Sequence, residues 1–124
     1  YFVFPSAANI PANYYTPLLS RTTKPVAIAE SGFSSQAVGF AQGSPEDQVV
    51  YLNAIHTQLG PRLAFWVNTL IDDFNIDSYA EQMKKDGRDP QDALSLGAFA
   101  SIGLRNSDGT PKPALEVWEG FRKK

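Results

Sequence analysis

One stretch constrains the fold more than any other: a short apolar run that ends on a carboxylate and a glycine turn. Pro25 opens the run, and proline suits the first residue of a strand because its ring fixes φ. Residues 26–29 are all apolar, with no polar alternation. A short run of this kind, bounded by turn residues, is typical of a strand buried on both faces in a parallel sheet. The pattern predicts a strand over 25–30 that ends on Glu30.

A carboxylate at the end of a buried strand needs a reason, because burying an unpaired charge is costly. In barrels of parallel strands, the carboxyl ends of the strands carry the catalytic groups. Two interpretations of Glu30 are open at this point. It is a catalytic residue, or it caps a neighbouring helix or pairs with an arginine.

A helix and a second strand follow. Ser44 is a suitable N-cap, Pro45 suits the first helical position, and two acids come next over the positive end of the helix. Apolar residues at helical spacing extend the helix to about Leu59, and a Gly-Pro pair ends it. A second apolar run then predicts a buried strand over 63–68. Strand, helix and strand in this order form the βαβ unit of a parallel sheet.

The remaining segments are less sharply patterned. We expect a brief helical segment within 10–19, and a long excursion over 70–92 with a helical patch near 78–85. A tight turn is predicted at 106–109. A last helix follows Thr110, with three of its apolar residues facing the core: Leu115, Trp118 and Phe121.

Composition excludes several classes of function. The chain has 124 residues, 43% of them hydrophobic, which is enough for a core. A net charge of −2 argues against a nucleic-acid partner. The absence of cysteine excludes disulfides, thiolate metal sites and a cysteine nucleophile. The lone histidine, His56, falls in a helical pattern and is interpreted as structural, so no metal or cofactor is expected. No apolar stretch is long enough for a membrane span, and the first residues lack the features of a signal peptide.

Three motifs now stand in a recognisable order. The first motif is Pro25, four apolar residues and Glu30-Ser31-Gly32-Phe33. The second is the predicted strand that contains Phe65-Trp66. The third consists of Gly103-Leu104, Asp108-Gly109-Thr110-Pro111-Lys112-Pro113-Ala114 and Trp118. Together they resemble the C-terminal part of retaining (β/α)8-barrel glycoside hydrolases of the endo-β-galactanase (arabinogalactanase) and endo-1,3-β-glucanase kind. Phe33 departs from that pattern, because tryptophan is commoner there.

The resemblance implies an α/β fold, namely a partial TIM (β/α)8 barrel. Residues 1–124 would form a single unit holding the end of strand six and strands seven and eight with their helices. Glu30 would be the nucleophile, but the acid/base residue, which ends strand four in such barrels, would be missing. Asp72 and Asp73 are the only other acidic pair just after a strand, and we do not assign either this role. By itself the chain should not hydrolyse a glycoside.

Four further residues are candidates for substrate contact. Alternation along the strands places Val26 and Ile28 on the face of Glu30, toward the barrel interior, and Trp66 and Asn68 toward the barrel mouth. Trp66 would then offer a sugar its aromatic face, or else be a core tryptophan with a satisfied indole N–H. Phe33 is a second aromatic candidate, although loop packing is its stronger interpretation. Tyr1 would donate a hydrogen bond to Glu30.

Two functions are therefore carried forward. The first is a fragment of a retaining polysaccharide hydrolase whose full-length parent is secreted or periplasmic, with an oligo- or polysaccharide as substrate. The alternative is a non-catalytic carbohydrate-binding or assembly module. A serine hydrolase is disfavoured, because the segment 32–36 lacks the second glycine of a nucleophile elbow. Unclosed strands leave apolar surface, so we expect self-association, or docking on the rest of the barrel, through the strand edges and the face of Val26, Ile28 and Trp66.

Overall fold

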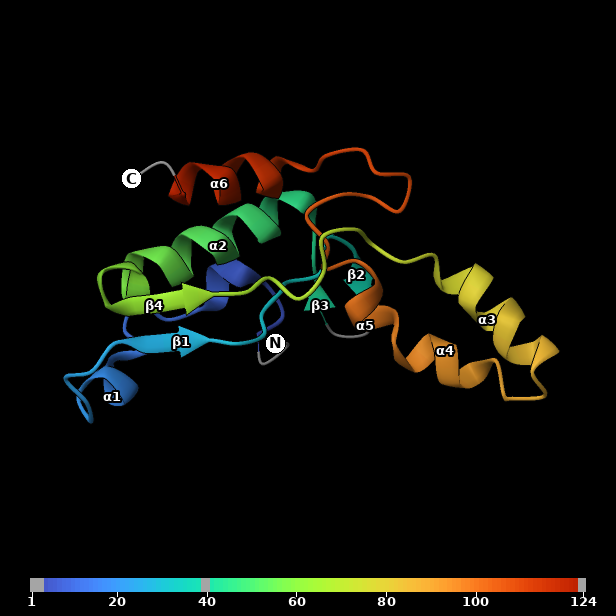
Figure 1. Ribbon diagram of the computed structural model, residues 1–124, viewed down its shortest axis with the longest axis horizontal. Helices are drawn as coiled ribbons and strands as arrows, with labels where there is room; N and C mark the ends of the chain where they lie inside the picture. The colour runs from blue at the N-terminus through green and yellow to red at the C-terminus, as the bar shows by residue number, and fades with distance from the viewer. Residues whose placement is uncertain (1–3, 39–40, 123–124) are drawn as a thin grey trace.

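Two short parallel strands form the central sheet of the protein, seen in a computed structural model that describes residues 4–38 and 41–122 (Figure 1). Strand β1, Val26–Ile28, pairs with β4, Leu63–Trp66, and Ile28 lies opposite Trp66. The parallel pairing predicted from the sequence is confirmed. Both strands are shorter than predicted, although the N–H of Val67 still donates to the Ile28 carbonyl at 2.9 Å. The mixture of helix and strand agrees with the α/β class.

Helix α2, Pro45–Leu59, connects the two strands and has the predicted bounds. The Ser44 hydroxyl oxygen accepts a 3.0 Å hydrogen bond from the N–H of Asp47, which satisfies one of the unpaired donors of the first turn. A 3-10 turn, η2, Gly60–Arg62, then leads directly into β4. The Gly-Pro pair thus ends the helix where the sequence indicated.

The core lies on one side of this sheet, under α2 and the last helix, α6, Pro113–Phe121 (Figure 1). Leu52, Ile55 and Leu59 of α2 are 1–2% exposed. Burying each of them contributes roughly 1.5–3 kcal/mol. The sheet residues that pack against this cluster are Val26, Ile28, Leu63 and Trp66. The predicted inward face of α6 is confirmed, because Leu115, Trp118 and Phe121 pack against the same cluster.

The other face of the sheet is uncovered by the described residues. Ala27 and Ala29 are exposed, and Phe65 and Val67 are 55% and 42% exposed. The prediction of strands buried on both faces is therefore wrong for this chain. A second layer would be needed to bury the apolar run completely, and the described residues supply only one.

The side chains that face the helices also correct the sequence analysis. Val26, Ile28 and Trp66 pack against the helical layer, so the prediction that Val26 and Ile28 line a barrel interior together with Glu30 is wrong. In β4, Leu63 and Trp66 share a face although three positions separate them. The reason is a shift in register: Val26 lies opposite Leu63 and Ala27 lies opposite Phe65, which leaves Ala64 as an extra residue. Such a bulge interrupts the alternation of a strand.

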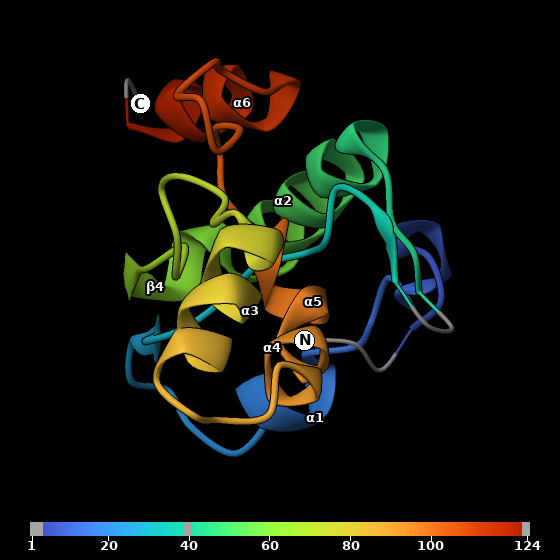
Figure 2. The same cartoon turned by 90° about the vertical axis from the view of Figure 1, so that its right-hand side faces the viewer.

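The segments after the strands lie beyond their carboxyl ends (Figures 1 and 2). Strands β2, Ala37–Val38, and β3, Ala41–Gln42, form an antiparallel pair that the sequence did not suggest. The predicted helical patch is α3, Ile76–Lys85, where the Asn75 side chain accepts from the N–H of Ser78. Two short helices complete this part, α4, Gln91–Ser95, and α5, Gly97–Ala100.

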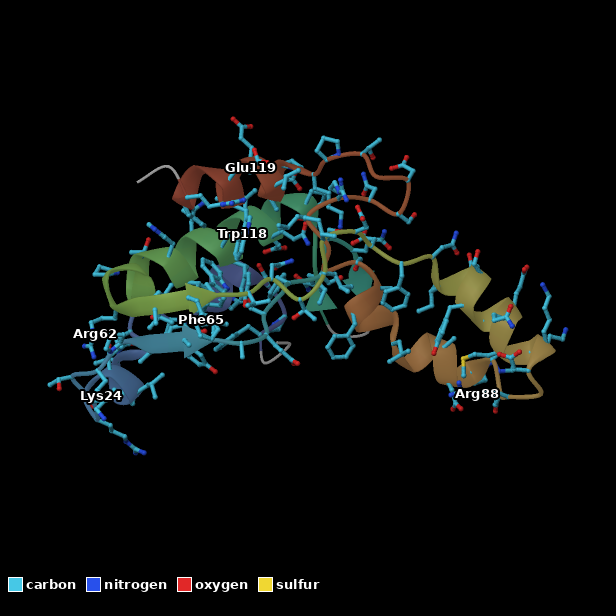
Figure 3. All side chains as sticks on the ribbon, viewed as in Figure 1. Lys24, Arg62, Phe65, Arg88, Trp118 and Glu119 are labelled. Carbon is cyan, nitrogen blue, oxygen red and sulfur yellow. The ribbon has the colours of Figure 1, made fainter. Side chains whose placement is uncertain are left out.

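The N-terminal segment packs against α2 and the same core, where Ala7 is buried and Ile10, Tyr15 and Leu19 contact the cluster. It contains a 3-10 turn, η1, Ala7–Asn9, and one short helix, α1, Thr16–Leu19, so only the second half of the predicted segment 10–19 is α-helical. Arg62 fixes the entry to β1, donating to the carbonyls of Thr22 and Lys24 at 2.8 Å (Figure 3). Among the described residues, no helix combines the length and apolar character that crossing a membrane requires.

Candidate functional site

Glu30 lies just past the carboxyl end of β1, two residues after Ile28, and is exposed. Trp66 ends the neighbouring parallel strand on the same edge of the sheet. The sequence therefore predicted the position of Glu30 along the sheet correctly, although the strand stops short of it. The side chain of Glu30 is therefore in contact with solvent at this edge of the sheet.

The residue after Glu30 fastens the two strand ends together. The hydroxyl of Ser31 accepts a 2.7 Å hydrogen bond from the indole N–H of Trp66 and donates a 2.8 Å bond to the carbonyl of Val67. The backbone N–H of Ser31 donates to the hydroxyl of Thr69 at 3.1 Å, and the N–H of Thr69 donates to the Ser31 carbonyl at 2.8 Å. These bonds hold the segment that follows β1 against the segment that follows β4, at the edge where Glu30 emerges.

Trp66 is a core residue in this structure. Its ring is half-buried, makes an edge contact with Trp118 at 4.8 Å and stacks with Phe121 at 5.8 Å. Its N–H is satisfied by Ser31. The interpretation as a core tryptophan is therefore the one that fits, because the ring faces the helices instead of the open side of the sheet.

Phe33 and Asn68 are also occupied by the fold. Phe33 is 2% exposed and its ring lies 5.5 Å from that of Tyr51, so it packs the loop and offers no surface to a substrate. The Asn68 amide donates to the carbonyls of Leu70 at 2.7 Å and Ile102 at 3.2 Å, which holds the chain after β4. Tyr1 lies outside the described residues.

The segments around this edge are held by a buried ion pair that sequence reasoning missed. The Lys112 ammonium lies 2.7 Å from the carboxylate of Asp73, and the two side chains are 3% and 9% exposed. The same ammonium donates to the Ser35 hydroxyl at 2.9 Å and to the carbonyls of Gly103 and Ser101 at 3.0 and 3.2 Å. The only sign of this ion pair in the sequence is a lysine between two prolines, which was interpreted only as part of the third motif.

Burial dominates the electrostatics of this pair. Burial raises the pKa of the Asp73 carboxyl above its ordinary value, against the opposing effect of the Lys112 ammonium. Burial likewise lowers the pKa of the Lys112 ammonium, and Asp73 opposes that shift. Holding two charges in this interior thus carries a desolvation cost that their attraction offsets only in part.

A second buried polar group extends the same cluster. The amide of Gln48, on α2, donates to the Phe33, Ser101 and Gly103 carbonyls at 2.8–3.3 Å. The hydroxyls of Ser34 and Ser101 lie 2.6 Å apart. Through these contacts α2, the loop after Glu30 and the segment 101–103 form one connected polar core. Its function in this structure is to fix the loop that follows Glu30.

Neither acid after β4 is placed for proton transfer. Asp72 accepts two hydrogen bonds from the Arg105 guanidinium, at 2.6 and 2.8 Å, and this pairing raises the pKa of Arg105. Asp73 is engaged by Lys112. Both carboxylates are thus engaged in ion pairs in this structure. Within residues 4–38 and 41–122, no cluster of acidic or histidine side chains is arranged to hold a metal ion.

Comparisons of the chain with protein families, with curated proteins and with solved structures gave no significant match.

Proposed function

We propose that this chain is the C-terminal part of a retaining (β/α)8-barrel glycoside hydrolase and that Glu30 is its nucleophile. The observation that carries the proposal is the one-sided covering of two parallel strands. Helix α2 follows β1, and α6 follows β4 after α3, α4 and α5; α2 and α6 cover the same face of the sheet, and the described residues leave the opposite face open. In a (β/α)8 barrel the helices cover the outside of the strands and the other face lines the interior. The position of Glu30, past the carboxyl end of β1, is the catalytic edge of such a barrel.

The proposed chemistry is a double displacement. The Glu30 carboxylate attacks the anomeric carbon of an oligo- or polysaccharide, forming a carbon–oxygen bond as the glycosidic bond breaks. A carboxylic acid elsewhere in the parent protein gives its proton to the departing oxygen. Water then attacks the same carbon, returns a proton to that second group and releases Glu30. The two carboxyl groups of a retaining enzyme lie about 5–5.5 Å apart. The proposal takes the second group from another part of the parent protein, because Asp72 and Asp73 are engaged by Arg105 and Lys112.

The substrate contacts of this proposal differ from those expected from the sequence. Trp66, Asn68 and Phe33 are engaged in the core and in loop packing, so we assign none of them to substrate binding. On the open face, Phe65 is the exposed aromatic residue of β4. It replaces Trp66 as the aromatic side chain that lines the proposed interior.

The alternative is a non-catalytic assembly module, and the open sheet face favours it as well. Phe65 and Val67 expose apolar surface on a two-stranded sheet, which another polypeptide would cover. A carbohydrate-binding module that acts through Trp66 has less support, because that ring is half-buried against Trp118 and Phe121. The reading frame of the parent gene distinguishes these functions: a strand-ending Asn-Glu pair upstream favours the enzyme.

The test uses the full-length parent protein. Glu30→Gln should lower turnover by at least about a thousandfold with little change in substrate affinity, because the amide is nearly isosteric but a poor nucleophile. Glu119→Gln is the matched control, since Glu119 is exposed on the far side of α6 and should leave turnover unchanged (Figure 3).

A second variant tests whether Glu30 is the nucleophile or only supports the structure. With Glu30→Ala, azide should restore cleavage of an activated glycoside and yield a glycosyl azide of inverted anomeric configuration, because a small anion replaces the missing carboxylate in a single displacement. Near-normal turnover of Glu30→Gln, or a glycosyl azide of retained configuration, would contradict the proposal.

A further inference from the structure

A cavity of about 370 Å³ lies between the C-terminal ends of α2 and α6, above β4. Its walls include four ring side chains from three elements: His56 of α2, Trp66 of β4, and Trp118 and Phe121 of α6. Figure 3 shows Trp118 on the side of α6 that faces the sheet. The volume is in the range of small-molecule pockets, roughly 300–1,000 Å³.

The rings form a fixed aromatic wall. His56 stacks on Phe121 with ring centres 4.1 Å apart and planes 1° apart. Phe121 in turn stacks with Trp66 at 5.8 Å, and Trp66 meets Trp118 edge-on at 4.8 Å. Each ring is held by at least one other, so a flat ligand would meet preformed faces and cause little side-chain ordering.

The polar side chains that line the pocket are mainly hydrogen-bond donors, and His56 is the one that can also accept. The indole N–H of Trp66 is used by Ser31. Arg122 lies at the rim, exposed, and makes no ion pair with any described residue. No carboxylate is among the lining residues, and two further basic residues follow Arg122 in the sequence.

We propose that this pocket binds a planar aromatic ring that carries a carboxylate. The rings provide the stacking surface, and the guanidinium of Arg122 provides donors for the anion. The ends of α2 and α6 place partial negative charge at the same place. That partial charge is reduced, because terminal carbonyls of both helices accept hydrogen bonds from cap N–H groups. Arg122, by contrast, carries a full positive charge. A neutral sugar would need more acceptors than His56, the one lining side chain able to accept.

The sequence makes the test direct, because the chain has only two tryptophans and both line the pocket. A ¹H–¹⁵N spectrum therefore contains two indole signals, which Trp118→Phe assigns. Three probes of the same shape and different charge are titrated into the full chain: phenylacetate, 2-phenylethanol and 2-phenylethylamine. We expect phenylacetate to shift the Trp118 indole signal most, and to bind about fivefold or more tightly than the neutral alcohol.

Matched variants test the rim. Arg122→Gln should weaken phenylacetate about fivefold and leave 2-phenylethanol unchanged, whereas Arg88→Gln, an exposed arginine far from the pocket, should change neither (Figure 3).

Three results would overturn the proposal. They are equal binding of all three probes, tighter binding of the amine through cation–π contact, and no shift at any soluble concentration. Indole signals that broaden with protein concentration and ignore the probes would identify an interface between copies instead. No outcome depends on hydrolase activity, so failure here leaves the function proposed for Glu30 intact.

Discussion

The indole nitrogen of Trp66 donates a 2.7 Å hydrogen bond to the hydroxyl oxygen of Ser31, the residue that follows Glu30. This bond joins the ends of two parallel strands that are 35 positions apart in the chain. Ser31 is 2% exposed, so the contact is sheltered from water. The edge at which Glu30 emerges is therefore braced by the tryptophan that the sequence suggested as a substrate platform.

Ser31→Ala should lower the free energy of unfolding by about 1–3 kcal/mol, because it leaves the Trp66 N–H and the Val67 carbonyl without this partner. Urea denaturation followed by tryptophan fluorescence measures the change. Ser107→Ala, at an exposed serine, is the control and should alter stability by less than about 0.5 kcal/mol. Equal stability of the two variants would show that the brace contributes nothing.

Gly32→Ala should destabilise the fold by about 1–3 kcal/mol through overpacking. A Cβ atom at Gly32 would lie 2.8 Å from two side-chain carbons of Ile102, which is 1% exposed. Gly120→Ala is the matched control, because nothing lies within 4 Å of its added Cβ on α6. There alanine should raise stability by up to about 1 kcal/mol through helix propensity. Thermal unfolding of both variants tests the contrast, and a neutral Gly32→Ala would contradict it.

Lys112→Met should cost about 3–5 kcal/mol, because it leaves the Asp73 carboxylate buried and unpaired. Adding Asp73→Leu should recover part of that loss. Recovery stays incomplete, since the Ser101 and Gly103 carbonyls also lose their donor. Arg105→Met breaks the half-exposed pair with Asp72 and should cost only about 0–1 kcal/mol. A double variant no more stable than Lys112→Met would argue against coupling between the two charges.

The raised pKa of Asp73 predicts a pH dependence. The folded state holds this proton more tightly than the unfolded chain does, so the carboxyl contributes most stability below its ordinary value of 3.8. That contribution is lost as the pH rises through the folded-state pKa. Asp73→Asn removes the titration. The stability of the wild type relative to Asp73→Asn should therefore fall as the pH rises from 3.8 toward neutrality. Denaturation at a series of pH values checks it, and the opposite slope would contradict it.

Phe65→Asp should reduce self-association of the chain. The sequence predicted association through Val26, Ile28 and Trp66, but those side chains pack under the helices, and the exposed apolar face is that of Phe65 and Val67. Sedimentation at micromolar concentration should show a concentration-dependent species for the wild type that Phe65→Asp shifts to monomer. Leu18→Asp, at a residue 50% exposed on α1, should leave it unchanged. A wild type that sediments as a monomer at all concentrations would refute the prediction.

Local chemistry was sufficient to predict the strand–helix–strand unit. Ser44, Pro45 and the Gly-Pro pair specify the ends of α2 through interactions within a few residues of each end, and these ends agree with the structure. The turn at 106–109 is likewise specified by its own residues, with Gly109 at a positive φ of 84° that glycine adopts without strain. The position of Glu30 at the carboxyl edge followed from the parallel pairing alone.

The sequence by itself thus determined the strand–helix–strand order, the ends of α2 and the edge at which Glu30 emerges. Only the tertiary structure decided which face of each strand meets the helices. Alternation divides a strand into two faces without saying which is covered, and the extra residue Ala64 moved Trp66 to the helical side. It also decided the pairing of Lys112 with Asp73, 39 positions apart. No residue near either charge in the sequence indicates this ion pair, because both side chains become buried only when four distant segments pack together.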